Sequence, residues 1–494
     1  MENQQGDSLI ISDQVKVNGN LTPLTLTTEG KLQWTTEKGQ HSLTVEKEVL
    51  GFTIQGSKII IKAVTEKRDG IFCSASAGGG ALARKDFVFE PLSDESLHLW
   101  CQHLRDYINS LGRPKRLFIF VNPFGGKKSA LKIYFDVVKP LLEDADVQIT
   151  VQETKYQLHA KEVVRAMDLT KYDGIVCVSG DGILVEVVNG LLEREDWNAA
   201  IKMPLGTVPA GTGNGMVKST LDSAGEPCTA SNAVVAIIRG HKCSLDVATI
   251  LQGDTKFFSV LMFAWGLVAD IDIESEKYRW MGSARLDFYG LQRMLCLRQY
   301  SGRISFVPAP GFEAYGEPTR YNGEFTSTQS SINPGQEQHV KAEQYSYQGP
   351  DVDLTNLEWR TINGPFISVW LHNVPWGGEG TMAAPDAKFA DGNLDLILIK
   401  DCPKLGLLAL MTNLSDGGHV KSPHVMYLKV KAFILEPGQR TKDPTRGGII
   451  DIDGEVLARG NGTYKHDQKT LMTYDKLQIT MDQGLATLFC PVQQ

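Results

Sequence analysis

The sequence contains no long hydrophobic run and no excess of basic residues. Its 50 Lys and Arg stand against 58 Asp and Glu, which gives a formal net charge of −8 at pH 7. This balance excludes nucleic-acid binding by a general attraction to phosphate. The longest nearly apolar stretch, residues 257–269, is too short to cross a bilayer and reads as a core strand and turn. The start "MENQQGDSLI" lacks the basic and apolar segments of an export signal, so we expect a cytoplasmic protein.

Close cysteine pairs are also missing. The eight cysteines are scattered from Cys73 to Cys490, and none are spaced as in a zinc knuckle. We therefore expect reduced thiols, as in a cytosolic compartment, and no metal ion held by the protein alone. His159, His372 and His419 lie outside any pattern of metal ligands, and we expect structural or surface roles for them.

The chain has 494 residues, more than one core accommodates, and should form several domains. Residues 1–112 contain short β-rich runs and then a segment, residues 93–112, with apolar residues at helical spacing. Ser93 or Asp94 would cap this helix. We predict a small N-terminal β module closed by one helix, which resembles a pleckstrin-homology domain and has Trp100 in its core.

The pattern changes after residue 112. Residues 113–245 alternate strand patterns such as "RLFIFVNP" with helical ones, which predicts an α/β lobe with a parallel sheet. Ligands of such sheets bind beyond the carboxyl ends of the strands. Residues 246–494 are rich in strand patterns and predict a β-rich, sandwich-like lobe. Within it, residues 309–356 are polar and rich in Gly, Pro, Ser and Gln, which predicts a disordered insertion.

Three glycine-rich turns carry the strongest chemical signal. They read "VNPFGGKKSA" from Val121, "SGDG" from Ser179 and "PAGTGNGM" from Pro209. Glycine lets the backbone approach an anion closely, and a following helix offers free N–H groups. One such turn is more often structural, but three that follow strand-like runs favour a phosphate site. The first turn lacks the Walker A spacing, which disfavours a P-loop ATPase.

These motifs resemble those of the sphingosine kinases (sphingoid long-chain-base kinases) of the diacylglycerol-kinase superfamily. The resemblance covers about residues 115–310 and 360–480 and rests on "VNPFGGK", "SGDGILVEVVNGL", "PAGTGNGM", "AWGLVADIDIESEKYRWMGSAR" and "DGE", in that order. It implies ATP-dependent phosphorylation of the primary hydroxyl of a sphingoid base. The α/β lobe would then bind the nucleotide and the β-rich lobe the lipid, with Mg²⁺ bridging the ATP phosphates.

The resemblance also implies the roles of individual residues. Asp181 would be the general base that takes the proton of the lipid hydroxyl. Asp272 would recognise the substrate amine, because a buried ammonium needs an anionic partner. The expected substrate-binding residues are Ser179, Gly180, Asp181, Gly182 and Asp272. The expected nucleotide contacts are Asn122, Pro123, Phe124, Thr154, Lys155, Tyr156, Gln157, Leu158, Glu186, Gly211, Thr212, Gly213, Arg279, Arg285, Asp453, Gly454 and Glu455.

Alternatives to this interpretation stay open. The acidic residues from Asp270 to Glu276 could instead form a solvated face of a helix. A kinase for a neutral lipid, ceramide or diacylglycerol, would not need Asp272, because those substrates have no free amine. A non-catalytic lipid-binding adaptor is disfavoured by the presence of Asp181, Asp453 and Glu455.

Residues 285–300 are a candidate segment for contact with a membrane. Their apolar side chains recur at helical intervals between arginines. Such a helix either packs into the core or forms a lid over the lipid chain that touches a membrane surface. We expect the protein to associate peripherally with membranes.

Overall fold

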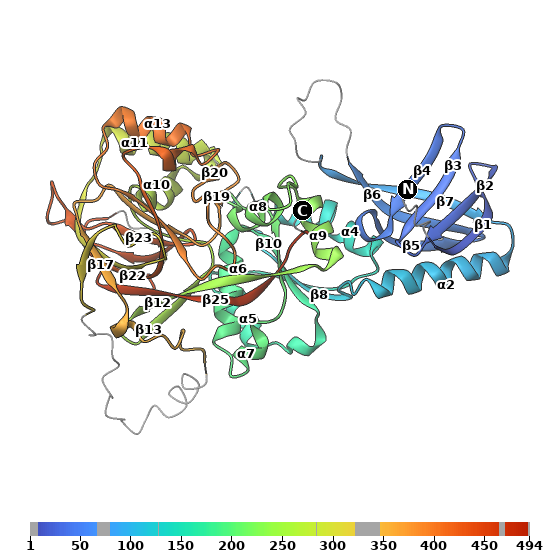
Figure 1. The fold of residues 1–494 in the computed structure, drawn as a ribbon, viewed down its shortest axis with the longest axis horizontal. Coiled ribbons are helices and arrows are strands. Elements are labelled where there is room, and N and C mark those ends of the chain that lie inside the picture. The colour runs from blue at the N-terminus through green and yellow to red at the C-terminus, as the bar shows by residue number, and fades with distance from the viewer. Residues whose placement is uncertain are drawn as a thin grey trace, which may run out of the picture.

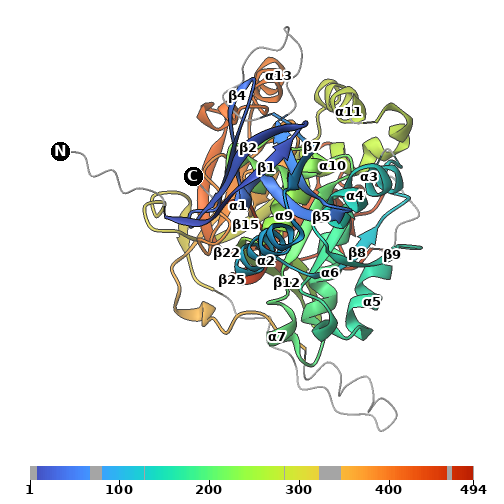
Figure 2. The ribbon, with the colours of Figure 1, turned by 90° about the vertical axis from the view of Figure 1, so that its right-hand side faces the viewer.

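The computed structural model describes residues 8–66, 80–126, 128–282, 284–321, 346–463 and 470–492. Three parts follow one another along the longest axis (Figure 1). A β module formed by the N-terminal residues is followed by a central α/β lobe and then by a β-rich lobe. Viewed along this axis from the N-terminal side, the module lies in front of the α/β lobe (Figure 2).

The N-terminal module is a seven-stranded antiparallel sheet closed by one helix, as predicted. The Ser93 hydroxyl caps that helix by accepting a hydrogen bond from the N–H of Ser96 at 3.2 Å. Trp100 is fully buried between the helix and the sheet, which confirms its core role. The elements are β1 (Leu9–Val17), β2 (Asn20–Thr27), β3 (Lys31–Thr36), β4 (Gly39–Thr44), α1 (Val45–Glu48), β5 (Val49–Gln55), β6 (Lys58–Glu66), β7 (Leu82–Pro91) and α2 (Asp94–Ser110).

The α/β lobe contains the predicted parallel sheet, in the strand order β11-β10-β8-β9. Its central strands are apolar and buried, as expected for a sheet covered by helices on both faces. The elements are β8 (Arg116–Val121), α3 (Ala130–Ile133), a π-helical turn (Tyr134–Val138), α4 (Lys139–Asp144), β9 (Gln148–Glu153), α5 (His159–Ala166), β10 (Gly174–Ser179), α6 (Asp181–Leu192), α7 (Trp197–Ala200), β11 (Leu205–Pro209), α8 (Gly215–Asp222) and α9 (Ala230–Arg239).

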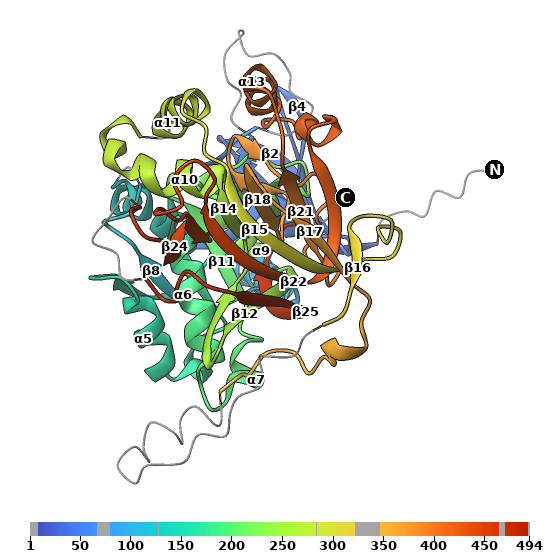
Figure 3. The ribbon, with the colours of Figure 1, turned by 90° about the vertical axis from the view of Figure 1, so that its left-hand side faces the viewer.

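The β-rich lobe is built mainly from antiparallel strands, with helices α10, α11 and α13 at one end (Figure 3). Its elements are β12 (Lys242–Gln252), β13 (Thr255–Ser259), β14 (Met262–Gly266), α10 (Leu267–Glu274), the 3₁₀ helix η3 (Ser275–Met281), α11 (Ala284–Leu295), β15 (Tyr300–Pro308), β16 (Glu317–Thr319), β17 (Trp359–Asn363), β18 (Ser368–His372), β19 (Trp376–Gly378), β20 (Thr381–Met382), β21 (Leu394–Ile399), α13 (Lys404–Thr412), β22 (Met426–Arg440), β23 (Ile449–Ile452), β24 (Glu455–Arg459) and β25 (Leu477–Phe489).

The sheets of the two lobes are continuous. β25 pairs with β12 and β22 in the β-rich lobe, and its end reaches β11 of the α/β lobe through Leu205 and Leu488. β12 itself begins at Lys242, before the predicted boundary at residue 245. Shared strands therefore hold the lobes together, although the local sequence pattern shows two separate units.

Two predicted segments need correction. The apolar run 257–269 is not only strand and turn, because α10 begins inside it at Leu267. The predicted disordered insertion 309–356 has ordered ends, since β16 pairs with β17, and Tyr347 is buried against Trp197 and Phe258. A few apolar residues docked on an existing core order these ends despite their polar composition. Residues 322–345 lie outside the described residues.

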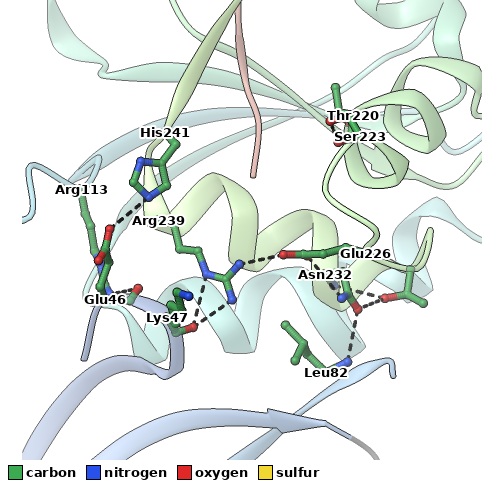
Figure 4. Close-up of polar contacts among 11 residues, drawn as sticks. Glu46, Lys47, Leu82, Arg113, Thr220, Ser223, Glu226, Asn232, Arg239 and His241 are labelled. Atoms are coloured by element: carbon green, nitrogen blue, oxygen red, sulfur yellow. Dashed lines mark hydrogen bonds and ion pairs between the residues drawn. The ribbon is translucent and has the colours of Figure 1, made fainter. Parts of the chain in front are cut away.

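The module is joined to the α/β lobe by arginine side chains that bind its backbone carbonyls (Figure 4). The buried guanidinium of Arg113 donates to four carbonyls at 2.8–3.1 Å, those of Val45, Glu46, Val49 and Leu50. Arg239 donates to the carbonyl of Lys47 and forms an ion pair with Glu226 at 2.9 Å. The module is therefore fixed to the lobe that carries the glycine-rich turns.

We expect Arg113→Ala to lower the free energy of unfolding by about 2–4 kcal/mol, because three buried carbonyls and one half-buried carbonyl would lose their donor. Burial lowers the pKa of Arg113 to about 10, so the group stays charged at neutral pH. Urea denaturation of the full chain measures the change, with the exposed Lys38→Ala as the control. Equal urea concentrations at the unfolding midpoints of the two variants would contradict a structural role for the Arg113 contacts.

Candidate active site

The three glycine-rich turns meet at one edge of the parallel sheet. In the sheet register Val178 of β10 pairs with Val121 of β8, and Ser179 pairs with Pro209 of β11. The turns that follow these strands touch through backbone atoms. A Cβ on Gly126 would lie 2.8 Å from the carbonyl carbon of Gly211, and one on Gly211 would clash with the Gly180 backbone. Glycine is required at these positions because the backbones approach so closely.

Asp181 begins α6, directly at this meeting point. Its carboxylate accepts hydrogen bonds from the N–H groups of Gly215 at 2.9 Å and Met216 at 3.0 Å, the first residues of α8. Burial raises the pKa of Asp181, and these backbone hydrogen bonds oppose that rise. A Cβ on Gly213 would lie 3.4 Å from the Asp181 carboxylate. The carboxylate is thus held rigidly beside the third glycine-rich turn.

Asn214 shapes that third turn. It adopts a left-handed conformation, with φ of 58°, which asparagine tolerates better than most residues. Its side chain accepts from the N–H of Gly211 at 2.9 Å and donates to the carboxylate of Glu379 at 2.6 Å. Sequence reasoning missed both residues. The asparagine inside "GTGNGM" was an available signal, whereas nothing near Glu379 in the sequence indicated this contact.

The predicted nucleotide residues of the α/β lobe border the same edge. Asn122 to Phe124 follow β8, and Thr154 to Leu158 follow the neighbouring β9. Glu186 of α6 holds this second turn by accepting from the N–H groups of Leu158 at 2.9 Å and Ala160 at 3.0 Å. Phe124 and Tyr156 are 61% and 54% exposed, so two aromatic side chains flank the turns in solvent.

Residues 453–455 connect the β-rich lobe to the glycine-rich turns. The buried Asp453 carboxylate accepts from the N–H groups of residues 260–262 and from the Ser259 hydroxyl, so it shapes the turn between β13 and β14. Burial raises the pKa of Asp453 to about 6. A Cβ on Gly182 would lie 3.4 Å from Oε1 of Glu455. Glu455 also accepts from Gln157 at 3.2 Å.

Asp272 lies on α10 and faces a second carboxyl group. Its carboxyl group lies next to that of Asp451 of β23, both oxygens of which are buried without a hydrogen-bond donor among the described residues. Two carboxyl groups this close in a buried place cannot both ionise, so we expect the pair to hold one proton. Burial raises the pKa of both groups, and the charge of Asp272 further raises that of Asp451. A Cβ on Gly454 would lie 3.8 Å from Asp272, which places the pair next to the 453–455 turn. Asp451 was also missed, although it alternates with Asp453 and Glu455.

The other acidic residues of α10 do not form a solvated face. Asp270 and Glu274 are buried, and Arg298 donates to both, at 3.0 Å and 2.9 Å. The hydroxyl of Tyr300 donates to Asp270 at 2.7 Å. These residues form a buried ion-pair network that anchors α10, which excludes the solvated-face alternative for Asp270 and Glu274.

The two predicted arginines lie farther along the chain. The buried Arg285 guanidinium donates to the Ser275 hydroxyl at 2.8 Å and pairs with Glu276 at 3.1 Å. Among the described contacts, none joins it to the glycine-rich turns. Arg279 lies in η3, and its side chain is outside the described part of the structure.

An apolar cavity of about 80 Å³ adjoins α10 on the side of the β-rich lobe. Ser368 and His419 are its polar lining residues. Its apolar lining comes from α10, β18, β21, α13 and the segment after α13, with Leu267, Val268, Ile271, Trp370, Ile397, Ile399, Leu407, Leu410, Met411 and Leu414. The short helix α10 therefore carries Asp272 and also forms part of the cavity wall.

Helices α11 and α13 lie at one end of the β-rich lobe and carry exposed leucines (Figure 3). Leu291, Leu295, Leu405 and Leu408 are 49%, 63%, 82% and 44% exposed. None of the described helices is long and apolar enough to span a membrane. The described residues also contain no group of three His, Cys, Asp or Glu side chains that could hold a metal ion.

Comparisons with known proteins agree with this architecture. Residues 116–250 match the diacylglycerol kinase catalytic domain, and residues 342–471 match the YegS C-terminal NAD kinase beta sandwich-like domain. Sphingosine kinase 1 of Arabidopsis thaliana is 65% identical over 482 residues, which cover 98% of this chain and 96% of that protein. Sphingosine kinase 2 of the same plant is 62% identical, with 98% and 97% covered.

A neutral-lipid kinase is a more distant relative. Human ceramide kinase is 33% identical over 346 residues, which cover 65% of this chain and 62% of that protein. The similarity to the plant sphingosine kinases is about twice as high and extends through the N-terminal module. With its diacylglycerol-kinase-like catalytic lobe, sandwich-like second lobe and near full-length similarity, the chain belongs to the sphingosine kinase family.

Proposed function

We propose that the protein transfers the γ-phosphate of ATP to the primary hydroxyl of a sphingoid long-chain base. The observation that carries this proposal is the carboxyl pair formed by the half-buried Asp272 and the buried Asp451 beside the 453–455 turn, next to an apolar cavity. A sphingoid base has an ammonium near its hydroxyl and a long alkyl chain. The carboxyl pair matches the charge of the ammonium, and the apolar lining of the cavity suits a part of the alkyl chain.

The glycine-rich turns fit the nucleotide. Their backbone N–H groups and the N-terminus of α6 suit the phosphates, and the exposed rings of Phe124 and Tyr156 offer stacking surfaces for the base. Glu186 and Asp453 act by holding neighbouring turns in place. Thr154 to Leu158, Gly211 to Gly213 and Glu455 border the same space. We also keep Arg279 and Arg285 as proposed nucleotide contacts. To reach the nucleotide, their side chains would need the backbone near η3 to rearrange.

In the reaction, Asp181 takes the proton of the lipid hydroxyl. The hydroxyl oxygen attacks the γ-phosphorus, the bond to the β-phosphate oxygen breaks, and ADP leaves. Ser179, Gly180 and Gly182 shape the space around the hydroxyl. When bound with ATP, Mg²⁺ would offset the negative charge of the phosphates during the transfer.

The cavity alone would also suit a neutral lipid, so the amine decides between substrates. Ceramide and diacylglycerol have no ammonium to pair with the one negative charge that Asp272 and Asp451 carry together. The test is incubation of the purified full chain with labelled ATP and Mg²⁺, and separately with a sphingoid base, ceramide and diacylglycerol. We expect phosphorylation of the free base to exceed that of the others. Equal or preferred phosphorylation of a neutral lipid would overturn the proposal.

We also propose that the protein is cytoplasmic and binds membranes peripherally through α11 and α13. We expect the double variant Leu295→Ser, Leu405→Ser to bind phosphatidylcholine vesicles at least about tenfold more weakly, because two leucines no longer enter the bilayer. Its activity in detergent micelles should be retained. Leu21→Ser, a leucine of the N-terminal module that is 62% exposed, is the matched control. Unchanged vesicle binding of the double variant would contradict this contact.

The seven strands and C-terminal helix of the N-terminal module support its assignment as pleckstrin-homology-like. Its arginine-mediated contacts with the α/β lobe support a packing role.

A further inference from the structure

One segment of the β-rich lobe reaches across to the glycine-rich turns. We call residues 374–384 the strap; they include β19 and β20, which lie beside α8 (Figure 1). In the strap, the backbone N–H of Trp376 donates to the Ser219 hydroxyl at 3.1 Å, and its indole donates to Asp222 at 2.9 Å. The strap is therefore fastened to α8, whose first N–H groups hold Asp181.

The strap is fastened to the cavity wall as well. It directly follows β18, which supplies two lining residues of the cavity. The N–H of Met382 donates to the carbonyl of Leu414 at 2.7 Å, and the ring of His419 contacts the carbonyl of Ala383 at 3.0 Å. Leu414 and His419 both line the cavity. One short segment thus links the cavity to the turn beside Asp181.

Glu379 makes the decisive contacts with that turn. Its N–H donates to the carbonyl of Gly213 at 2.8 Å, and its carboxylate accepts from Asn214 at 2.6 Å. Asn214 in turn bonds both the N–H and the carbonyl of Gly211. An exposed glutamate from one lobe therefore closes a glycine-rich turn of the other.

We propose that Glu379 is a positioning residue for phosphoryl transfer, which holds the 211–214 turn through Asn214 and so aligns Asp181 with the nucleotide. This inference rests on the proposed role of Asp181 as the base. Because the strap also contacts Leu414 and His419, which line the cavity, it couples the lipid-binding lobe to the reacting groups.

The test compares two substitutions of Glu379 in the full chain. Glu379→Ala removes the acceptor for Asn214, and we expect kcat to fall about tenfold to thirtyfold, with KM for the lipid unchanged. Glu379→Gln keeps an oxygen that accepts the same hydrogen bond, and kcat should stay within about threefold of wild type. Asp386→Ala, an exposed carboxylate just beyond the strap, is the control for charge loss.

The pH profile separates positioning from general damage. The titratable groups around Asp181 are Glu455, Glu379, Cys228 and the Lys218–Asp222 pair of α8. Loosening the turn weakens the Gly215 and Met216 hydrogen bonds, which raises the pKa of Asp181. The acid limb of kcat should therefore move to higher pH in Glu379→Ala relative to Glu379→Gln, since both variants remove the same charge.

Two results would overturn the inference: a wild-type kcat and acid limb in Glu379→Ala, or equal losses in both variants. A wrong assignment of Asp181 as the general base would give a different result. In that case Asp181→Asn would keep the wild-type turnover and the acid limb of the pH profile, whatever the Glu379 variants show.

Discussion

Asp181→Asn is expected to lower turnover by a factor of about a hundred to ten thousand, the usual range for loss of a general base. Single-turnover assays with saturating ATP and sphingoid base measure this directly. The reason is that an amide cannot take the proton of the lipid hydroxyl. Because the ionised carboxylate is the active form, wild-type kcat should fall as the pH drops through the raised pKa of Asp181. The Asn variant should lack this limb.

The structure adds a control that this experiment needs. Both oxygens of Asp181 accept N–H groups of α8, and asparagine has one acceptor oxygen only. Some loss of stability is therefore expected along with the loss of turnover. Thermal unfolding and ATP binding of the variant show how much protein is folded and competent to bind nucleotide. Turnover near wild type in a folded variant would exclude Asp181 as the base.

Asp272→Asn is expected to act on the amine of the substrate. It removes a charge-assisted hydrogen bond to a poorly solvated ammonium, a loss of about 2–4 kcal/mol. This corresponds to a decrease of about thirty- to a thousand-fold in kcat/KM for the free base. An N-acylated base has no ammonium, so whatever activity it supports should fall much less. Kinetics on both substrates measure the difference.

Asp451→Asn is the matched variant. The shared proton means that the pair carries one net negative charge, and an asparagine amide at position 451 would donate to an ionised Asp272. We expect a loss below about tenfold on the free base. Equal losses on both substrates for Asp272→Asn, or none on either, would show that Asp272 does not recognise the amine. The neutral-lipid alternative would then be favoured.

Much of the local structure was predictable because neighbouring residues determine it. Apolar side chains at helical spacing and the capping Ser93 predicted α2, and short apolar runs ending in glycine-rich turns predicted β8, β10 and β11. The ordered ends of the 309–356 segment were not predictable from composition. Tyr347 gains its stability from Trp197 and Phe258, which lie far away in the chain.

The features of the candidate site also fall into those that the sequence predicts and those that depend on the tertiary structure. By itself, the sequence determined that glycine-rich turns follow buried strands and that Asp181 and Asp272 lie in motifs of a lipid kinase family. Only the tertiary structure decided that Asp451 faces Asp272 and that Glu379 holds the turn beside Asp181. It also decided that β25 joins the sheets of the two lobes. Local patterns depend on propensity and turn geometry within a few residues, whereas these contacts depend on strand register and packing between segments far apart in the chain.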